Sequence, residues 1–257
     1  MPETGPDTGV TRAEVCVVAC AEAWRGDGEI FASGMGTIPV LGARLARASF
    51  EPDLMVSDGE AVFIANDLPL GSTDKHVEGW IPFRSVFDNL WSGRRHVMMG
   101  ASQIDCHGNQ NIACIGSFEK PKSQLLGMRG APGNTANHAV SYWIPNQSAR
   151  SFVQQVDVVS GLGYDRAAAA GPWIAAHHHL RRVVTQLGVF DFETADHRMR
   201  LASVHPGVTP DEVVAATGFE LVIDDGVAET RLPTADELVL LREVLDPGAL
   251  RNAEVRV

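Results

Sequence analysis

Apolar residues follow helix-like and strand-like spacings in turn along the first hundred positions. Thr11 and Glu14 have the spacing of a capping box, and the apolar face that follows predicts a helix ending near Gly26. The same patterns predict strands over 29–33, 54–57 and 96–99 and helices over 38–50 and 83–90. Strands that alternate with helices are typical of an α/β fold with a largely parallel sheet.

Strand-like runs dominate the middle of the chain, and helix signals return near its end. Strands are predicted over 112–115, 140–144, 156–160 and 183–192. Capping boxes at 209–212 and 234–237 predict two helices. Residues 166–179, with four consecutive alanines and three consecutive histidines, break the pattern, and we interpret them as a surface insertion or an arm that contacts a partner.

Composition narrows the class of protein. The 257 residues include 32 acidic and 21 basic side chains, giving a formal charge of −11, which argues against nucleic acid as the main partner. We see no apolar stretch approaching the roughly 18 residues of a membrane span, and no signal-peptide pattern. Four cysteines are too few for a disulfide scaffold. We therefore expect a cytoplasmic protein with a disordered segment 1–10 and one domain over 11–257.

Two short motifs follow predicted strands. Gly34 and Gly36 lie between a strand and a helix, where backbone amides can hold an anion, although general turn statistics favour a plain tight turn. It is not a dinucleotide-binding motif, because Pro39 replaces the third glycine. Asp58 and Glu60 place two carboxylates at the end of the next predicted strand. The pair could act in acid–base or nucleophilic catalysis, and a solvated turn explains it equally well.

Thiol and metal chemistry are weaker hypotheses. Cys106 with His107 or His138 has the residue types of a nucleophile and its base, but adjacent residues in a turn usually point apart. The histidines at 177–179 have no spaced set of further ligands, so we expect a flexible loop and no metal.

A glycine-rich segment over 127–134 is more informative. Its glycines and proline permit unusual backbone angles, and Arg129, Asn134, Asn137 and His138 supply polar groups in or near it. Such a loop suits stabilisation of an oxyanion by fixed donors.

Together these segments resemble the β subunits of family I coenzyme A transferases, over roughly residues 11–250. The resemblance begins with Gly34-Met-Gly36, Gly42-Ala43 and Pro52-Asp53. Two motifs resemble the glutaconate CoA-transferase branch of the family: Gly100-Ala-Ser-Gln103-x-Asp105-x-x-Gly108-Asn109-x-Asn111 and Gly116-x-x-x-x-Pro121-Lys122. The segments 127–134 and 156–164 and the tail 217–247 resemble the same branch. This resemblance implies an α/β fold with a mostly parallel central sheet flanked by helices.

The sequence departs from the family where its chemistry lies. Family I transferases attack the acyl-CoA with a β-subunit glutamate shortly after the Pro-Asp segment. With Pro52-Asp53 in register, Gly59 falls on that position, and a shift of one residue brings Asp58 or Glu60 there. Asp58 is one methylene short, and an error of about 1 Å can cost about a hundredfold in rate. The departure argues against a glutamyl-CoA thioester intermediate.

Three further segments, 78–83, 93–96 and 132–138, resemble one subgroup, the β subunits of actinobacterial ring-cleaving hydrolases of steroid breakdown. The resemblance implies hydrolytic opening of a cyclohexenone ring that carries a CoA thioester. It also implies an α2β2 heterotetramer with the essential acid–base glutamate on the α subunit. CoA is then part of the substrate, and no separate cofactor is expected. The expected substrate-binding residues are Gly34, Gly36, Arg129, Gly130, Asn134, Asn137 and His138.

Two rival interpretations remain open. In the first, the chain belongs to a working CoA transferase whose nucleophile is Asp58 or Glu60. In the second, it is a non-catalytic partner that only completes the fold and the cavity wall of the α subunit.

Overall fold

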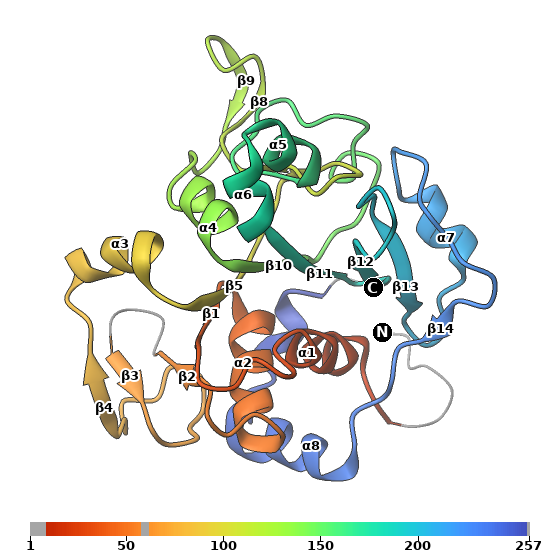
Figure 1. Cartoon of the computed structure of the whole chain (residues 1–257). Helices are drawn as coiled ribbons and strands as arrows, with labels where there is room; N and C mark the ends of the chain where they lie inside the picture. Colours follow the sequence, from red (N-terminus) through yellow and green to blue (C-terminus); the bar gives the residue numbers. More distant parts are fainter. Residues whose placement is uncertain (1–8, 58–61, 256–257) are drawn as a thin grey trace.

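An eight-stranded sheet forms the centre of the protein (Figure 1). The computed structural model describes residues 9–57 and 62–255. The strand order is β14-β13-β12-β11-β10-β5-β1-β2. The neighbours from β2 to β11 run parallel, β11, β12 and β13 run antiparallel, and β14 joins β13 in parallel. The sheet strands are β1 (Phe31–Gly34), β2 (Met55–Val56), β5 (Arg95–Met99), β10 (Ala139–Ile144), β11 (His179–Thr185), β12 (Gly188–Asp191), β13 (Arg200–Val204) and β14 (Ala228–Glu229). The predicted α/β fold with a mostly parallel sheet is confirmed.

Three small hairpins and eight α-helices complete the described part of the chain. The hairpins pair β3 (Val62–Ile64) with β4 (Val77–Trp80), β6 (Gln103–Ile104) with β7 (Gln110–Asn111), and β8 (Cys114–Gly116) with β9 (Pro121–Gln124). The helices are α1 (Arg12–Glu22), α2 (Thr37–Ser49), α3 (Phe83–Ser92), α4 (Ala131–Asn137), α5 (Tyr164–Ala169), α6 (Pro172–His177), α7 (Pro210–Ala215) and α8 (Ala235–Val239). A π-helical turn (Leu240–Leu245) and a 3-10 turn (Leu250–Ala253) follow.

Alternation along the strands divides the core into two layers. Ala32 of β1 and Met98 of β5 pack with α1, α2 and the C-terminal turns on one face. Val97 and Met99 pack on the other face with Tyr142 and the segments around α4. Figure 1 shows α1, α2 and α8 on one side of the sheet and α4, α5 and α6 on the other. No helix in the described ranges has both the length and the apolar composition to cross a bilayer.

Most predictions of local structure near the two ends of the chain are confirmed. All three capping boxes form, beginning with Thr11 Oγ1, which accepts from the backbone N–H of Glu14 while the Glu14 carboxylate accepts from that of Thr11. The predicted strands and helices of the first hundred residues exist, with shifted ends; α1, for example, stops at Glu22 instead of Gly26. The first described residues, 9 and 10, pack against the protein, with Val10 buried, whereas residues 1–8 of the segment expected to be disordered lie outside the described part.

The strand predictions in the middle of the chain need correction. Segment 156–160 forms no strand, because Asp157 bonds through its backbone N–H to the Gln103 side chain and through its carboxylate to the N–H of Gly116. The predicted strand 112–115 begins only at Cys114. The predicted strand 183–192 is a hairpin, with Thr185 Oγ1 accepting from the backbone N–H groups of residues 187 and 188 in the turn.

The segment 166–179 lies largely on the surface, as expected for an insertion, but it is helical, so the flexible loop expected at the three histidines is wrong. It holds most of α5, all of α6 and the first residue of β11. His178 is buried, and its Nδ1 donates to the carbonyl of Thr135 in α4 at 2.8 Å. This bond fixes the middle histidine of the three within the fold.

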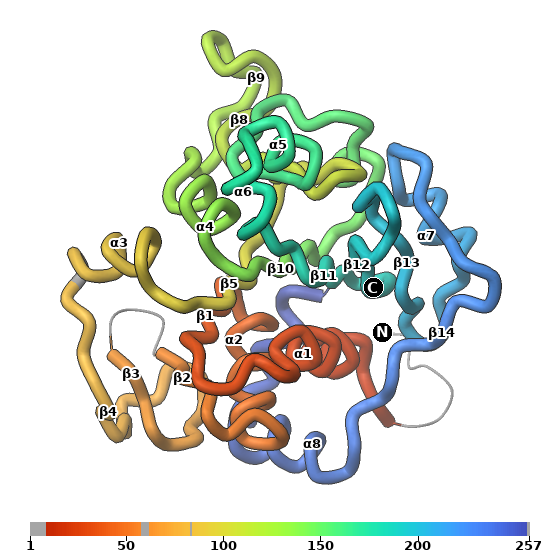
Figure 2. The backbone as a smooth tube through the Cα atoms, viewed as in Figure 1, coloured from red at the N-terminus to blue at the C-terminus, as the bar shows by residue number. Residues whose placement is uncertain are grey.

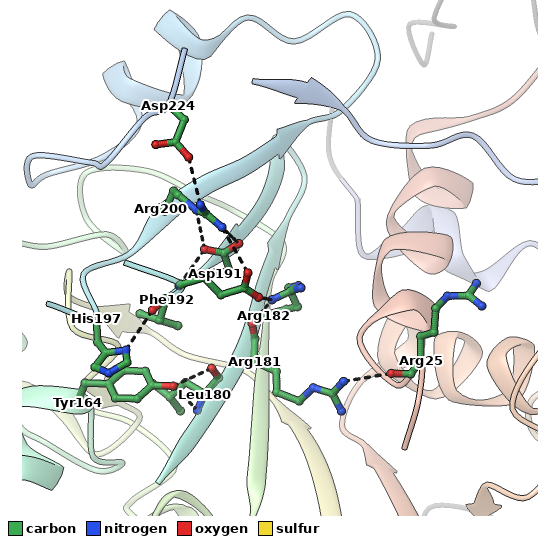
Figure 3. Close-up of polar contacts among 11 residues, drawn as sticks. Arg25, Tyr164, Leu180, Arg181, Arg182, Asp191, Phe192, His197, Arg200 and Asp224 are labelled. Atoms are coloured by element: carbon green, nitrogen blue, oxygen red, sulfur yellow. Dashed lines mark hydrogen bonds and ion pairs between the residues drawn. The ribbon is translucent and has the colours of Figure 1, made fainter. Parts of the chain in front are cut away.

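Ion pairs fasten the antiparallel half of the sheet (Figure 3). Arg200 of β13 forms a two-bond pair with the buried Asp191 of β12, at 3.0 and 2.8 Å, and also reaches Asp224 at 3.1 Å. Arg181 of β11 donates to the carbonyl of Arg25 after α1 at 3.1 Å. These contacts connect β13 to β12, and β11 to the segment that follows α1.

The buried carboxylate of Glu14 connects the two ends of the described chain. Helix α1 and the C-terminal segment lie side by side (Figure 2). Glu14 is 1% exposed and accepts from Arg242 Nε at 2.7 Å and from Arg251 Nη2 at 3.0 Å. Arg251 also pairs with Asp246 at 2.9 Å. Burial alone would raise the pKa of Glu14, but the hydrogen bond from Arg242 and the remaining contacts lower it to about 2.

Replacing Glu14 by Gln should destabilise the protein, because it removes the buried carboxylate that binds both Arg242 and Arg251 and leaves Arg251 with Asp246 alone. We expect the free energy of unfolding, measured in urea, to fall by about 3 kcal/mol. Since the folded-state pKa lies below the ordinary 4.5, this contribution is present above pH 4.5 and is lost as pH falls toward 2. The exposed capping-box variant Glu212→Gln is the control and should change stability little. An equal loss in both variants would contradict the assignment.

Candidate functional site

The sheet has a topological switch between β1 and β5. From β1 the chain passes through α2 to β2 at one edge, whereas from β5 it passes through α4 to β10 on the other side. Because the two connections diverge, a crevice opens at the carboxyl ends of these strands, where α/β proteins usually bind ligands. Gly34 ends β1, and Gly100 directly follows β5.

A cavity of about 420 Å³ occupies this crevice. Its walls are mostly apolar, with few polar side chains, which is typical of small-molecule sites. The lining residues are Met35, Met99, Gly100, Ala101, Ser102, Ile112, Leu126, Arg129, Gly130, Ala131 and Asn134. None of them is an aspartate, a glutamate or a histidine.

Three of the predicted substrate-binding residues line this cavity: Arg129, Gly130 and Asn134. Only 127–130 is a loop, because α4 begins at Ala131, so the prediction of one loop over 127–134 was too long. Arg129 has a φ of +49°, in the left-handed region that is uncommon for a non-glycine residue. Such backbone strain tends to concentrate at ligand-binding sites.

Asn134 supplies a buried amide to the cavity. Its side chain is 2% exposed, and its Nδ2 donates only to the Met99 thioether sulfur, at 3.3 Å. Its Oδ1 has no hydrogen-bond donor among the described residues. Since a thioether is a weak acceptor, the amide retains hydrogen-bonding capacity for a ligand.

Asn137 and His138 do not line the cavity. Asn137 Nδ2 donates to the carbonyls of Leu90 at 3.0 Å and Gly133 at 3.1 Å, which ties α4 to α3. His138 is buried, and burial, together with the nearby Arg95, lowers its pKa. The structure therefore separates these two predicted residues from Arg129 and Asn134.

The first turn of α2, directly after Gly36, binds an anion, but that anion belongs to the protein itself. The Glu254 carboxylate accepts from the backbone N–H groups of Thr37 at 2.7 Å and Ile38 at 3.1 Å, and from Trp143 Nε1 at 3.1 Å. Gly36 has a φ of +113°, and a Cβ on Gly34 would stand 2.7 Å from the Pro39 backbone. The amides at the start of α2 thus bind an internal carboxylate, and the expectation that Gly34 and Gly36 contact the substrate stays a prediction.

Asp58 and Glu60 lie outside the described residues. The last described residue before them, Ser57, lines a small cleft that Gly34 of the neighbouring strand also lines. Ser57 therefore lies at the same end of the sheet as the cavity.

The described part of the chain contains no arrangement of side chains suited to thiol or metal chemistry. Cys106 is half-buried, burial raises its pKa, and no hydrogen bond joins it to His107 or His138. No group of three or more histidine, cysteine, aspartate or glutamate side chains in the described ranges is arranged to hold a metal ion.

Comparison with known proteins gives matches over nearly the whole chain. The sequence profile named coenzyme A transferase matches residues 86–216. The IpdB subunit of the cholesterol ring-cleaving hydrolase of Rhodococcus jostii is 54% identical, with 97% of this chain and 98% of that protein covered. A glutaconate CoA-transferase subunit of Acidaminococcus fermentans is 27% identical, with 94% of each covered.

Solved structures match the same two groups of proteins. The crystal structure of Rhodococcus jostii IpdAB superposes with a TM-score of 0.92 at 52% identity, covering 97% of this chain and 100% of that one. The Acidaminococcus fermentans glutaconate CoA-transferase superposes with a TM-score of 0.77 at 25% identity, covering 97% and 99%. The resemblance predicted from the sequence motifs is confirmed.

Replacing Glu254 by Ala should destabilise the protein, because three donors lose their acceptor and α2 loses its charged cap. We expect the free energy of unfolding in urea to fall by about 2 kcal/mol. The exposed Glu243 lies in the same C-terminal region, and Glu243→Ala should change stability little. Equal stability of the Glu254 variant and the wild type would contradict the capping role.

Proposed function

The chain belongs to the coenzyme A transferase family, and we propose that it is the β subunit of a hydrolase that opens a cyclohexenone carboxyl-CoA ring late in steroid breakdown. The observation that carries the proposal is its similarity to the ring-cleaving IpdB subunit, 54% over nearly the whole length, against 27% to the glutaconate CoA-transferase subunit. A cytoplasmic location fits this role.

The proposed reaction needs no covalent nucleophile. Water adds to the ring ketone, the bond from that carbon to the carbon beside the thioester breaks, and the released electron pair forms the thioester enolate. A proton on the carbon completes the ring-opened product, and the former ketone carbon becomes a carboxylate that carries the water oxygen. Catalysis then requires a base for water and fixed donors that face the developing enolate.

The cavity supports the second requirement. Arg129 and Asn134 are the charged and amide side chains among its lining residues, and its apolar walls suit a hydrocarbon ring. We assign both as contacts to the CoA-thioester substrate, whose coenzyme portion makes a separate cofactor unnecessary. Gly130 lets the backbone come close to the same ligand.

The base must come from elsewhere, because no aspartate, glutamate or histidine lines the cavity within the described residues. We propose that an α-subunit glutamate supplies it in an α2β2 heterotetramer. The superposition on IpdAB, whose name denotes a two-part protein, supports a partner subunit. Asp58 and Glu60 would then form a polar wall.

A working CoA transferase is the alternative. It would pass CoA between two acids through an enzyme thioester, so the complex would exchange labelled CoA between two carboxylic acids with ping-pong kinetics. The proposed hydrolase should show no exchange. Exchange that is abolished in the Asp58→Asn or Glu60→Gln variant would establish the transferase instead.

Replacing Asn134 by Ala in the assembled complex should lower kcat for ring opening by about a hundredfold, because one fixed donor to the enolate is lost. Arg129→Met should mainly raise KM, because the cation at the cavity mouth is lost. Arg150→Met, an exposed arginine away from the cavity, is the matched control and should keep wild-type kinetics. Unchanged turnover in both cavity variants, with assembly intact, would favour a non-catalytic partner subunit.

A further inference from the structure

The hairpin β3–β4 and helix α3 stand beside the β2 edge of the sheet and form what we term the lateral unit, residues 62–92 (Figure 1). Its surface carries an unusual number of large apolar side chains. Val77 is 63% exposed, Trp80 68%, Phe87 51% and Trp91 74%. Clusters of exposed aromatic side chains mark interaction surfaces more often than free protein surface.

A groove of about 580 Å³ separates the lateral unit from the sheet. Phe31 and Met55 line it from the strands, and Phe63 and Trp80 line it from the hairpin. Arg95, at the start of β5, also lines the groove and is only 5% exposed. An arginine is thus buried at a groove whose lining also includes three aromatic side chains.

The charge of Arg95 is not compensated among the described residues. Its Nη2 donates to Ser33 Oγ at 3.3 Å, its Nε has no acceptor, and its guanidinium carbon lies 5.7 Å from the Phe31 ring centre. Glu29 also lines the groove, but no ion pair joins it to Arg95 in the described part of the chain. Burial lowers the pKa of Arg95 to about 10, which leaves it protonated at neutral pH. Buried charges are normally paired, so the site calls for an anion.

The residues on two faces of α3 indicate what kind of ligand carries the anion that would pair with Arg95. Ser85 and Asn89, four residues apart, line the groove, whereas Phe87 and Trp91 are exposed and absent from its lining. Residues four apart share a helix face, so the aromatic pair lies on a different face from the groove pair. A small molecule in the groove would leave Phe87 and Trp91 exposed, whereas a protein surface can cover both sides.

We propose that the lateral unit and its groove form the docking surface for the companion subunit, which covers the exposed aromatic side chains and places a carboxylate against Arg95. This inference rests on the proposed function as one subunit of a heteromeric enzyme. The two-part name of the matched structure IpdAB supports a companion chain as the occupant. Aromatic side chains and arginine are also the residues that most often dominate binding energy at interfaces.

The first test is hydroxyl-radical footprinting of the wild-type complex, produced with its companion subunit and analysed by mass spectrometry. Trp80, Trp91 and Trp173 are the exposed tryptophans, and Trp173, on α6, is the internal control at 71% exposed. We expect strong protection of Trp80 and Trp91 relative to Trp173. Equal labelling of the three would overturn the proposal without any variant that might fail to fold.

The second test measures assembly of variants by analytical ultracentrifugation. Trp91→Glu should weaken association by at least about tenfold, whereas Trp173→Glu should assemble as the wild type does. Arg95→Met should weaken it by about a hundredfold, because the companion's carboxylate would lose its partner. Intact assembly of both variants, Trp91→Glu and Arg95→Met, would overturn the proposal. If Arg95→Met assembles normally but has a raised KM, the anion at Arg95 belongs to a small molecule, and the proposal is also wrong.

Two further outcomes identify the occupant of the docking surface and distinguish a failure of this proposal from a failure of the proposed function. If this chain alone dimerises and protects Trp91 as well as the complex does, the occupant is a second copy and the proposal is wrong. Footprinting and assembly do not depend on turnover. A complex that docks through the lateral unit but does not open the ring would therefore contradict the proposed function and leave the docking surface standing.

Discussion

The parallel pairing of β1 with β5 is the constraint on which the functional geometry depends. The two strands lie side by side, but their connections leave toward opposite edges of the sheet. The crevice at their carboxyl ends is a consequence of that divergence. Met35 after β1, Gly100 after β5 and Asn134 on α4 meet there because the topology brings three distant segments to one end of the sheet.

Two glutamates, the buried Glu14 and the half-buried Glu254, connect the C-terminal segment to the N-terminal elements. Glu14 on α1 binds Arg242 and Arg251, while Glu254 caps α2 and also accepts from Trp143 on β10. The second contact has a functional consequence. Because an internal carboxylate occupies the α2 amides, the proposed substrate contacts are Arg129 and Asn134, which line the cavity.

The sequence predicted local structure and the family more reliably than the details of the site. Capping boxes and the early β-α-β unit depend on neighbouring residues, and the structure confirms them. Glu254 was missed because its amide partners lie more than two hundred positions away. The apolar walls, such as Met99 and Leu126, resemble ordinary core residues in sequence. Asn137 and His138 were placed in the site by proximity, but α4 turns them toward α3.

In the proposed function, the chain contributes one wall of an active site, with donors and apolar surface, and the companion supplies the base. The most direct test is turnover of the cyclohexenone carboxyl-CoA substrate by the purified complex in ¹⁸O-labelled water, with mass spectrometry of product and protein. Direct hydrolysis predicts ¹⁸O in the new product carboxylate and none in the peptide that contains Asp58 and Glu60. Label in either of those carboxylates, or a CoA thioester on one of them, would contradict it.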